Sequence, residues 1–286
     1  LRWSLDSRWL TYCASAPNLF QQIFLFNVES GSTAALTTDR FNSSSPVFST
    51  DGKWLYLLSD RNLESLVMSP WGTRQPEPYF DKTVKIYHVA LKKDLRSPFQ
   101  AADELHPDSA KPPEGEKEKE KEPPAKKEAA AAPPKVEIDL DGIQNRISEV
   151  PAPPGNYSAL SAVAKRLCWV STARALPPVQ SLECLDIANK GDKPEILMAD
   201  IRGYELSSDG KKLLFRKQDD LFVVDATVKP AALRSAEDLN KSKVDLGAWT
   251  FALDPREELR QMFVEAWRLE RDYFYDPNMH SLDWPA

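Results

Sequence analysis

Histidine, cysteine and long apolar runs are all scarce in this chain of 286 residues. Its three histidines, His88, His106 and His280, have no second histidine or cysteine at the spacing of metal ligands, so each is interpreted as structural or solvated. No apolar run approaches the roughly 18 residues that a membrane span requires. We therefore expect no metal, no cofactor and no membrane span.

The three cysteines, Cys13, Cys168 and Cys184, are odd in number and lack the spacing of a zinc site. Two of them lie within apolar strand patterns. Because free cysteine behaves as a small hydrophobic residue, the sequence favours buried free thiols over a disulfide or a zinc site.

Sequence motifs of several enzyme classes are also missing. The chain has no G-x-S-x-G elbow, no G-x-x-x-x-G-K-[ST] loop and no G-x-G-x-x-G. The net charge of -6 and the pI near 5.3, without a cluster of Lys and Arg in any stretch that looks folded, argue against nucleic acid as a partner. We predict no catalytic, cofactor-binding or metal-binding residue within the chain.

What the sequence does contain is a repeat. The stretch PVFSTDGKWLYLL around Asp51 has counterparts in WSLDSRWLTY around Asp6, ALSAVAKRLCWVS around Val163 and ELSSDGKKLLFRK around Asp209. The spacing is 45 residues from Asp6 to Asp51 and 46 from Val163 to Asp209, which is typical of one supersecondary unit per repeat. This predicts an all-β fold: a partial β-propeller of about four blades, each a four-stranded antiparallel sheet, followed by a C-terminal α-helix.

The predicted propeller spans residues 1–251, with blades at roughly 1–40, 41–152, 153–201 and 202–251. Asp51-Gly52 is interpreted as a two-residue primed hairpin turn, since both residues tolerate positive φ. In the fourth blade, Val244 to Phe251, which includes Trp249, is the predicted last strand.

Two segments of the second blade stand apart. Residues 107–135, rich in Lys, Glu, Pro and Ala, hold almost nothing that a core could bury, so they are predicted to be a disordered or extended insertion just before the last strand of the blade. The loop before it carries aromatic and basic side chains that could form a recognition surface, but packing against their own blade is the favoured interpretation; they are Trp71, Arg74, Tyr79 and Phe80.

At Asp254 the apolar period changes from two to about 3.6. Asp254 as the cap, Pro255 at the first helical position and Glu257 three residues after the cap form a complete helix start. One face of the helix is apolar and aromatic, which implies a packing partner; it comprises Leu259, Met262, Phe263, Ala266, Trp267, Tyr273 and Phe274. We therefore predict that residues 252–286 begin a further, helical core domain and that the chain is a fragment.

Three blocks carry a resemblance to a known family: DRNLESLVMSPWGTRQPEPYFDKTVKIY, IDLDGIQNRISEVPAPPGNYSALSA and above all WTFALDPREELRQMFVEAWRLERDYFYDPNMHSLDW. They resemble the bacterial homologues of tricorn protease, and the resemblance covers essentially the whole chain. It implies that residues 1–251 are blades of the second propeller and that 254–286 begin the helical part of a serine-protease core related to the tail-specific, carboxy-terminal processing peptidases. The nucleophilic Ser, the base His and the supporting Ser and Glu would then lie beyond Ala286, and His280 is not the base.

By this resemblance the segment is non-catalytic, and its propeller gates or guides short peptide substrates to the missing core. The parent would be a cytoplasmic homo-oligomer, with the periplasm left open because an export signal could precede residue 1. Two alternatives remain at this point. One is the propeller of a prolyl oligopeptidase or dipeptidyl peptidase-type hydrolase, and the other is a TolB-like interaction platform.

Overall fold

The computed structural model describes residues 1–62, 65–67, 79–101, 103–104, 134–163, 165–189, 191, 193–233 and 235–284. It contains two compact units, Leu1–Val244 and Asp245–Ala286, which are described separately. Most of the predicted insertion, together with His106, Trp71 and Arg74 and the side chains of Tyr79 and Phe80, lies outside the described residues.

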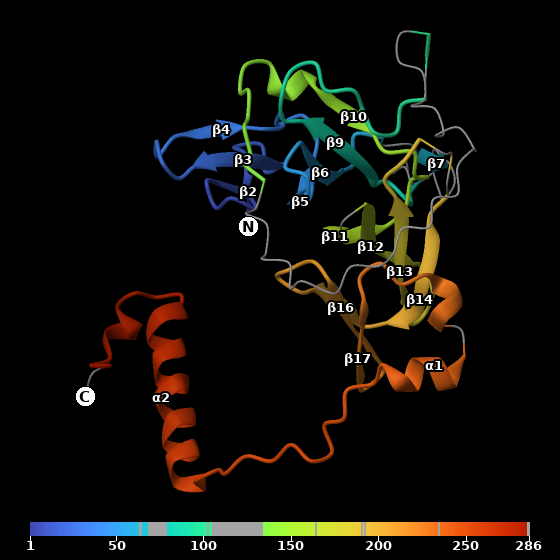
Figure 1. Cartoon of the computed structure of the whole chain (residues 1–286). Coiled ribbons are helices and arrows are strands. Elements are labelled where there is room, and N and C mark those ends of the chain that lie inside the picture. The colour runs from blue at the N-terminus through green and yellow to red at the C-terminus, as the bar shows by residue number, and fades with distance from the viewer. Residues whose placement is uncertain are drawn as a thin grey trace. The chain divides into compact units, whose positions relative to one another are not determined.

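The first unit is built from successive antiparallel sheets, which correspond to the four predicted blades (Figure 1). The first blade has the order β1-β2-β3-β4: Arg2–Trp3, Trp9–Ser15, Gln21–Asn27 and Thr33–Ala35. The second has the order β10-β9-β6-β5: Ile147–Glu149, Lys85–Ala90, Trp54–Ser59 and Ser43–Phe48. The third has the order β11-β12-β13-β14: Tyr157–Val163, Arg166–Ala173, Val179–Asp186 and Glu195–Ile201. The fourth has the order β15-β16-β17: Gly203–Leu206, Lys212–Lys217 and Asp220–Asp225.

Shorter elements complete this unit. β7 (Ser65–Val67) and β8 (Tyr79–Phe80) lie between β6 and β9 in the chain and pair with each other in a two-stranded sheet. The short helices are η1 (Ile143–Asn145), η2 (Pro230–Leu233) and α1 (Ala236–Lys241). The large insertion separates β9 from β10, which are the third and fourth strands of the second blade along the chain. The chain between these two strands includes residues 107–135, and the interpretation of that segment as an insertion stays a prediction.

The core of the first unit lies between neighbouring blades. All six residues of β6 are buried, because adjacent blades cover both of its faces. Leu55 and Leu57 face a cluster shared with Ile23 and Leu25 of the first blade. The alternate residues of β6 face a cluster shared with the third blade; they are Trp54, Tyr56 and Leu58, and Trp169 is among their neighbours. Strand periodicity thus divides one strand between two cores.

The repeated Ser-x-Asp turn has the same hydrogen bonds in three blades. In the second blade Ser49 N–H donates to the Trp54 carbonyl at 2.8 Å, Ser49 Oγ accepts from Trp54 N–H at 2.9 Å, and Asp51 Oδ1 accepts from Lys53 N–H at 3.0 Å. The equivalent bonds connect Ser4, Asp6 and Trp9 in the first blade, and Ser207, Asp209 and Lys212 in the fourth.

This geometry corrects the predicted two-residue turn at Asp51-Gly52. Gly52 has φ +68° but Asp51 does not have positive φ, and Gly52 N–H donates to the Ser49 carbonyl at 3.0 Å. The loop therefore runs from Ser49 to Trp54. The Ser49 and Asp51 side chains close this longer loop, so only the glycine position needs a left-handed backbone.

Two further predictions were wrong. Cys168 and Cys184 form a disulfide, with 4.1 Å between their Cα atoms, because the register of β12 and β13 sets them directly opposite each other. Only Cys13 is a free thiol, and it is half-buried. The predicted last strand from Val244 to Phe251 is also absent, since only Lys243 forms an isolated bridge to β17 and the aromatic side chains beyond it are exposed.

The second unit contains α2 (Pro255–Tyr273) and η3 (Met279–Ser281). Asp254 caps α2 as predicted, with its Oδ1 accepting from Arg256 N–H at 2.9 Å. The apolar face of α2 is exposed within the unit: Leu259, Met262 and Phe263 have relative exposures of 66%, 59% and 72%. The interpretation that residues 252–286 begin a further domain stays a prediction. None of the described helices is long and apolar enough to cross a membrane.

Candidate functional site

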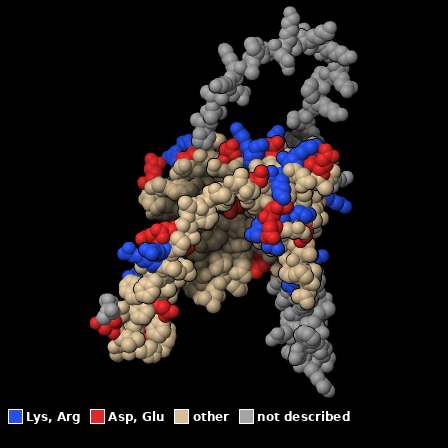
Figure 2. Space-filling model, turned by 90° about the horizontal axis from the view of Figure 1, so that it is seen from below, with Lys and Arg blue, Asp and Glu red and all other residues tan. Residues whose placement is uncertain are grey.

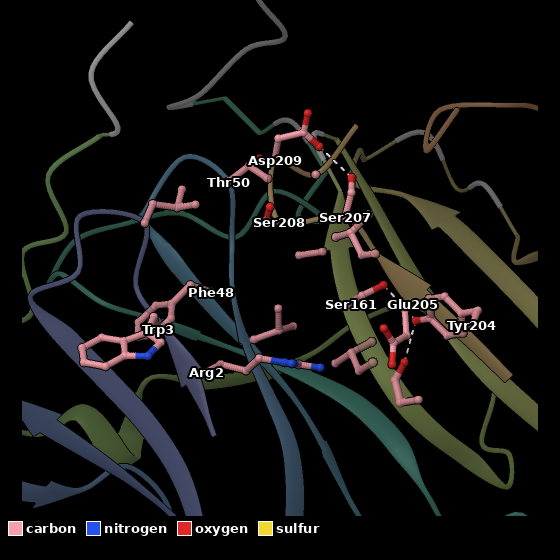
Figure 3. Close-up of a pocket in the computed structure, with 17 residues that line it drawn as sticks. Arg2, Trp3, Phe48, Thr50, Ser161, Tyr204, Glu205, Ser207, Ser208 and Asp209 are labelled. Carbon is pink, nitrogen blue, oxygen red and sulfur yellow. Dashed lines mark hydrogen bonds between the residues drawn. The ribbon is translucent and has the colours of Figure 1, made fainter. Parts of the chain in front are cut away.

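The first unit contains a pocket of about 470 Å³, and the first strand of each blade contributes to its wall (Figure 3). These four strands, β1, β5, β11 and β15, each form an edge of their sheet. The remaining wall comes from the Ser-x-Asp turns of the first, second and fourth blades, through Leu5, Thr50 and residues 207–210. The pocket is therefore a product of the repeat.

Strand register shows that four of the lining residues occupy equivalent positions. Arg2, Val47, Ser161 and Glu205 each lie opposite the third residue of the next strand in their blade, which is Thr11, Tyr56, Cys168 and Leu214 respectively. The fold therefore presents the same wall position four times. A cation, an apolar residue, a hydroxyl and an anion occupy it in turn.

Arg2 and Glu205 bring opposite charges to this pocket from the first and fourth blades. Both residues are exposed, and Figure 3 shows both side chains directed into the hollow. Neither side chain forms an ion pair or a hydrogen bond with another residue in the part of the chain that the structure describes. Both charged groups are thus available to a ligand.

Tyr204 anchors the fourth blade to the third beside these charges. Its hydroxyl oxygen lies 2.8 Å from Ser161 Oγ, 2.5 Å from the Ala159 carbonyl and 2.8 Å from the Cys168 carbonyl. Burial raises the pKa of Tyr204, while the Ser161 hydrogen bond and the positive charge of Arg2 act in the opposite direction. The phenol therefore remains neutral and can donate its proton to a carbonyl.

Two of the first strands are bulged where they border the pocket. Ser45 in β5 and Ala159 in β11 both have φ +51°, and the register shifts at each of them. A bulge interrupts the regular row of backbone donors and acceptors along a strand edge. The edges of β5 and β11 are therefore poor templates for a further strand, and side chains supply most of the recognition groups.

The chemistry of the wall is that of binding. The described residues that line the pocket include no histidine, cysteine or lysine, so neither the Ser161 nor the Ser207 hydroxyl has a histidine or lysine base beside it. Among the described residues, no group of three His, Cys, Asp or Glu side chains could hold a metal ion. Ser207 Oγ instead donates to Asp209 Oδ1 at 2.6 Å, and this bond lowers the pKa of the Asp209 carboxyl.

Neither described histidine is among the residues that line the pocket. His88 is buried in β9 among the rings of Trp54, Tyr56 and Phe99. His280 belongs to the second unit, where its ring contacts Phe274 and its Nε2 is hydrogen bonded to the Tyr275 hydroxyl. Neither ring is hydrogen bonded to a Ser, Thr or Cys side chain among the described residues.

Comparison with known proteins identifies this fold. Residues 1–227 match the model of the tricorn protease second beta propeller domain, and residues 255–286 match that of the tricorn protease C1 domain. The chain belongs to the tricorn protease family. The family resemblance inferred from the sequence is thus confirmed, and it is better supported than the two alternative classes.

Several curated relatives align with nearly the whole chain. "Tricorn protease homolog 1" of Streptomyces coelicolor is 30% identical, over 99% of this chain and 26% of its own length. A "Putative Tricorn-like protease C-terminal subunit" of Sulfurisphaera tokodaii is 25% identical, over 99% of this chain and 30% of its own length. The chain therefore spans about a quarter to a third of these relatives.

The crystal structure of tricorn protease supports the fold. It matches 96% of this chain, and 24% of its own chain, with a TM-score of 0.70 and 21% identity. Because residues 1–227 match the second propeller domain of the family, the pocket lies at the first strands of blades of that propeller.

Sequence reasoning missed the charged pair in this tricorn propeller segment, although the repeat carried a usable signal. Arg2, Val47 and Glu205 each lie two residues before the Ser of a Ser-x-Asp turn. Aligning the repeats on that Ser would have placed all three at one structural position. Ser161 needed the structure, because the turn that follows it does not keep the motif.

Proposed function

We propose that this chain is the substrate-guiding propeller segment of a tricorn-like serine peptidase, and that its catalytic residues lie outside residues 1–286. The single observation that carries the proposal is the pocket at the first strands of the blades. It offers the unpaired charges of Arg2 and Glu205, and none of its hydroxyls lies beside a histidine or lysine base. Peptides are the substrates that we assign to the parent protein.

Surface charge supports the rest of the proposal. Figure 2 shows Lys and Arg interspersed with Asp and Glu on the face in view, and the net charge is -6. A surface of this kind does not favour nucleic acid. We further propose that the full-length protein is a homo-oligomer.

For the compartment, the sequence favours the cytoplasm and leaves the periplasm open. The Cys168–Cys184 disulfide favours the periplasm, because disulfides persist in oxidising compartments and are rare in the cytosol. We therefore propose a periplasmic location, which fractionation of cells producing the full-length protein tests directly.

The activity is tested with two purified proteins: residues 1–286 and the full-length protein encoded by the same gene. We expect the full-length protein to hydrolyse short unfolded peptides and to react with a fluorophosphonate at a serine outside residues 1–286, found by peptide mapping. We expect the 286-residue chain to do neither. Hydrolysis by the shorter chain, abolished by a substitution within it, would contradict the proposal.

A further inference from the structure

The pocket at the first strands of the blades combines features that suit one class of peptide. Arg2 and Glu205 occupy equivalent positions of two blades, and both side chains enter the pocket without a partner among the described residues. Trp3 and Leu5 add apolar surface with relative exposures of 54% and 41%. The volume of the pocket, about 470 Å³, is within the range of small-ligand sites.

Backbone pairing contributes little to recognition here. Tyr204 holds the Ala159 carbonyl, and the positive φ of Ser45 and Ala159 interrupts the edges of β5 and β11. An extended peptide therefore cannot add a continuous strand to these blades. Selectivity between peptides must come from side chains that are not engaged with the fold.

We infer that this pocket is a charge-reading site that selects peptides carrying both an anionic group, received by Arg2, and a cationic group, received by Glu205. The smallest such ligands are short peptides with free carboxyl and amino termini. A guanidinium binds a carboxylate through paired N–H donors, and a carboxylate accepts from an ammonium. This inference rests on the proposed function, since it names the peptides that the propeller would pass.

The test uses the full-length protein and one uncharged hexapeptide sequence in four forms: free termini, N-acetylated, C-amidated, and blocked at both ends. KM and kcat are measured for each form with the unaltered protein, with Arg2→Gln and with Glu205→Gln. Arg40→Gln and Glu104→Gln are matched controls, because both residues are exposed and form no ion pair or hydrogen bond within the described ranges.

We expect Arg2→Gln to raise KM about tenfold for the peptides with a free carboxylate, and Glu205→Gln to do so for those with a free amine. The kcat values should be unchanged, because neither residue takes part in the chemical step. The double variant Arg2→Glu/Glu205→Arg should recover much of the preference for free termini, since it keeps both charges. Equal KM ratios in the variants and the controls would overturn the inference while leaving the proposed function intact.

A second measurement separates the two proposals. Fluorescence anisotropy reports binding of the same hexapeptides, labelled on a central side chain, to the full-length protein without any cleavage. If no peptide is hydrolysed, the proposed activity is wrong, and the inference then depends on binding alone. Binding that is about tenfold weaker in Arg2→Gln for free-carboxylate peptides only would support the site, and equal binding of all forms would refute it. Melting temperatures of the variants establish that they are folded.

Discussion

Two tyrosine hydroxyls of the first unit differ in their hydrogen-bond partners. The Tyr204 hydroxyl contacts Ser161 and two carbonyls, whereas the buried Tyr56 hydroxyl has no partner among the described residues. The same substitution should therefore have opposite effects. We expect Tyr204→Phe to lower the free energy of unfolding by about 1 kcal/mol and Tyr56→Phe to raise it by about 1 kcal/mol.

Urea unfolding of both variants, followed by tryptophan fluorescence, checks this contrast. Each variant controls for the other, because both changes remove one hydroxyl from a ring in the same unit. Shifts of the same sign and size would contradict the hydrogen-bond assignments.

His88 makes the stability of the second blade depend on pH. Burial lowers the pKa of His88 from 6.5 to about 4, and neither ring nitrogen has a hydrogen-bond partner among the described residues, although the Ser148 backbone lies close enough to oppose the shift. Between these two pKa values the unfolded chain binds a proton that the folded chain does not. Stability is therefore full above pH 6.5 and falls as the pH decreases towards 4, by up to about 3 kcal/mol.

Unfolding free energies from pH 7.5 to 4 in the unaltered chain and in His88→Phe test this sign. Phe suits the site because Trp54 and Phe99 already surround the ring. The variant should lose most of the decrease between pH 6.5 and 4. An unchanged pH profile would show that other groups cause it.

Charged and aromatic residues were only partly predictable at this scale. The interpretation of His88 as structural needed only its place in an apolar strand. The disulfide depended on how Cys168 and Cys184 align across a hairpin, which is set by the loop between β12 and β13 and not by their spacing. The sequence could not predict that the Arg2 and Glu205 side chains are unpaired, because that depends on which charged or polar side chains lie within bonding distance of them in the folded chain.

At the scale of the element, the Ser-x-Asp turn allows a matched comparison. Gly52 and Gly210 have φ of +68° and +69° in equivalent turns, but a Cβ at Gly52 would lie 3.0 Å from Val136 Cγ2, whereas a Cβ at Gly210 would meet nothing within 4 Å. Ser7 occupies the same position in the first blade with φ +58°, so the turn accepts a side chain at some cost.

We expect Gly210→Ala to lower the free energy of unfolding by about 1 kcal/mol through backbone strain alone. Gly52→Ala should cost about 2 kcal/mol, because the methyl group must also displace Val136. Thermal unfolding of the two variants gives the comparison. A larger effect at Gly210 would contradict the contact with Val136.

Most strands and the helix were predictable because their apolar periods are strong. The predicted fourth-blade strand from Val244 to Phe251 was not, although it carries apolar and aromatic residues. Trp249 and Phe251 are exposed at 75% and 78% within this chain, so no sheet buries them. Residue type alone does not reveal whether a neighbouring strand is available for pairing.

At the scale of the whole molecule, repetition was both the strongest signal and the source of the pocket. Four blades with one strand order place the same positions along one wall, and the substitutions at those positions give the wall its charge pattern. The repeat period predicted the scaffold. It could not predict the pocket without the strand register that aligns the four positions.

The insertion in the second blade also has a consequence for the order of folding. β9 ends at Ala90 and β10 begins at Ile147, so 56 residues separate them, whereas five residues separate β2 from β3 and β12 from β13. Closing the longer connection costs about 2 kcal/mol more in chain entropy. During synthesis at roughly 5–20 residues per second, the outer edge of β9 stays unpaired for several seconds until β10 has been made. The second blade is thus expected to be completed late, and newly made chains are most exposed to wrong strand pairing at β9 during that interval.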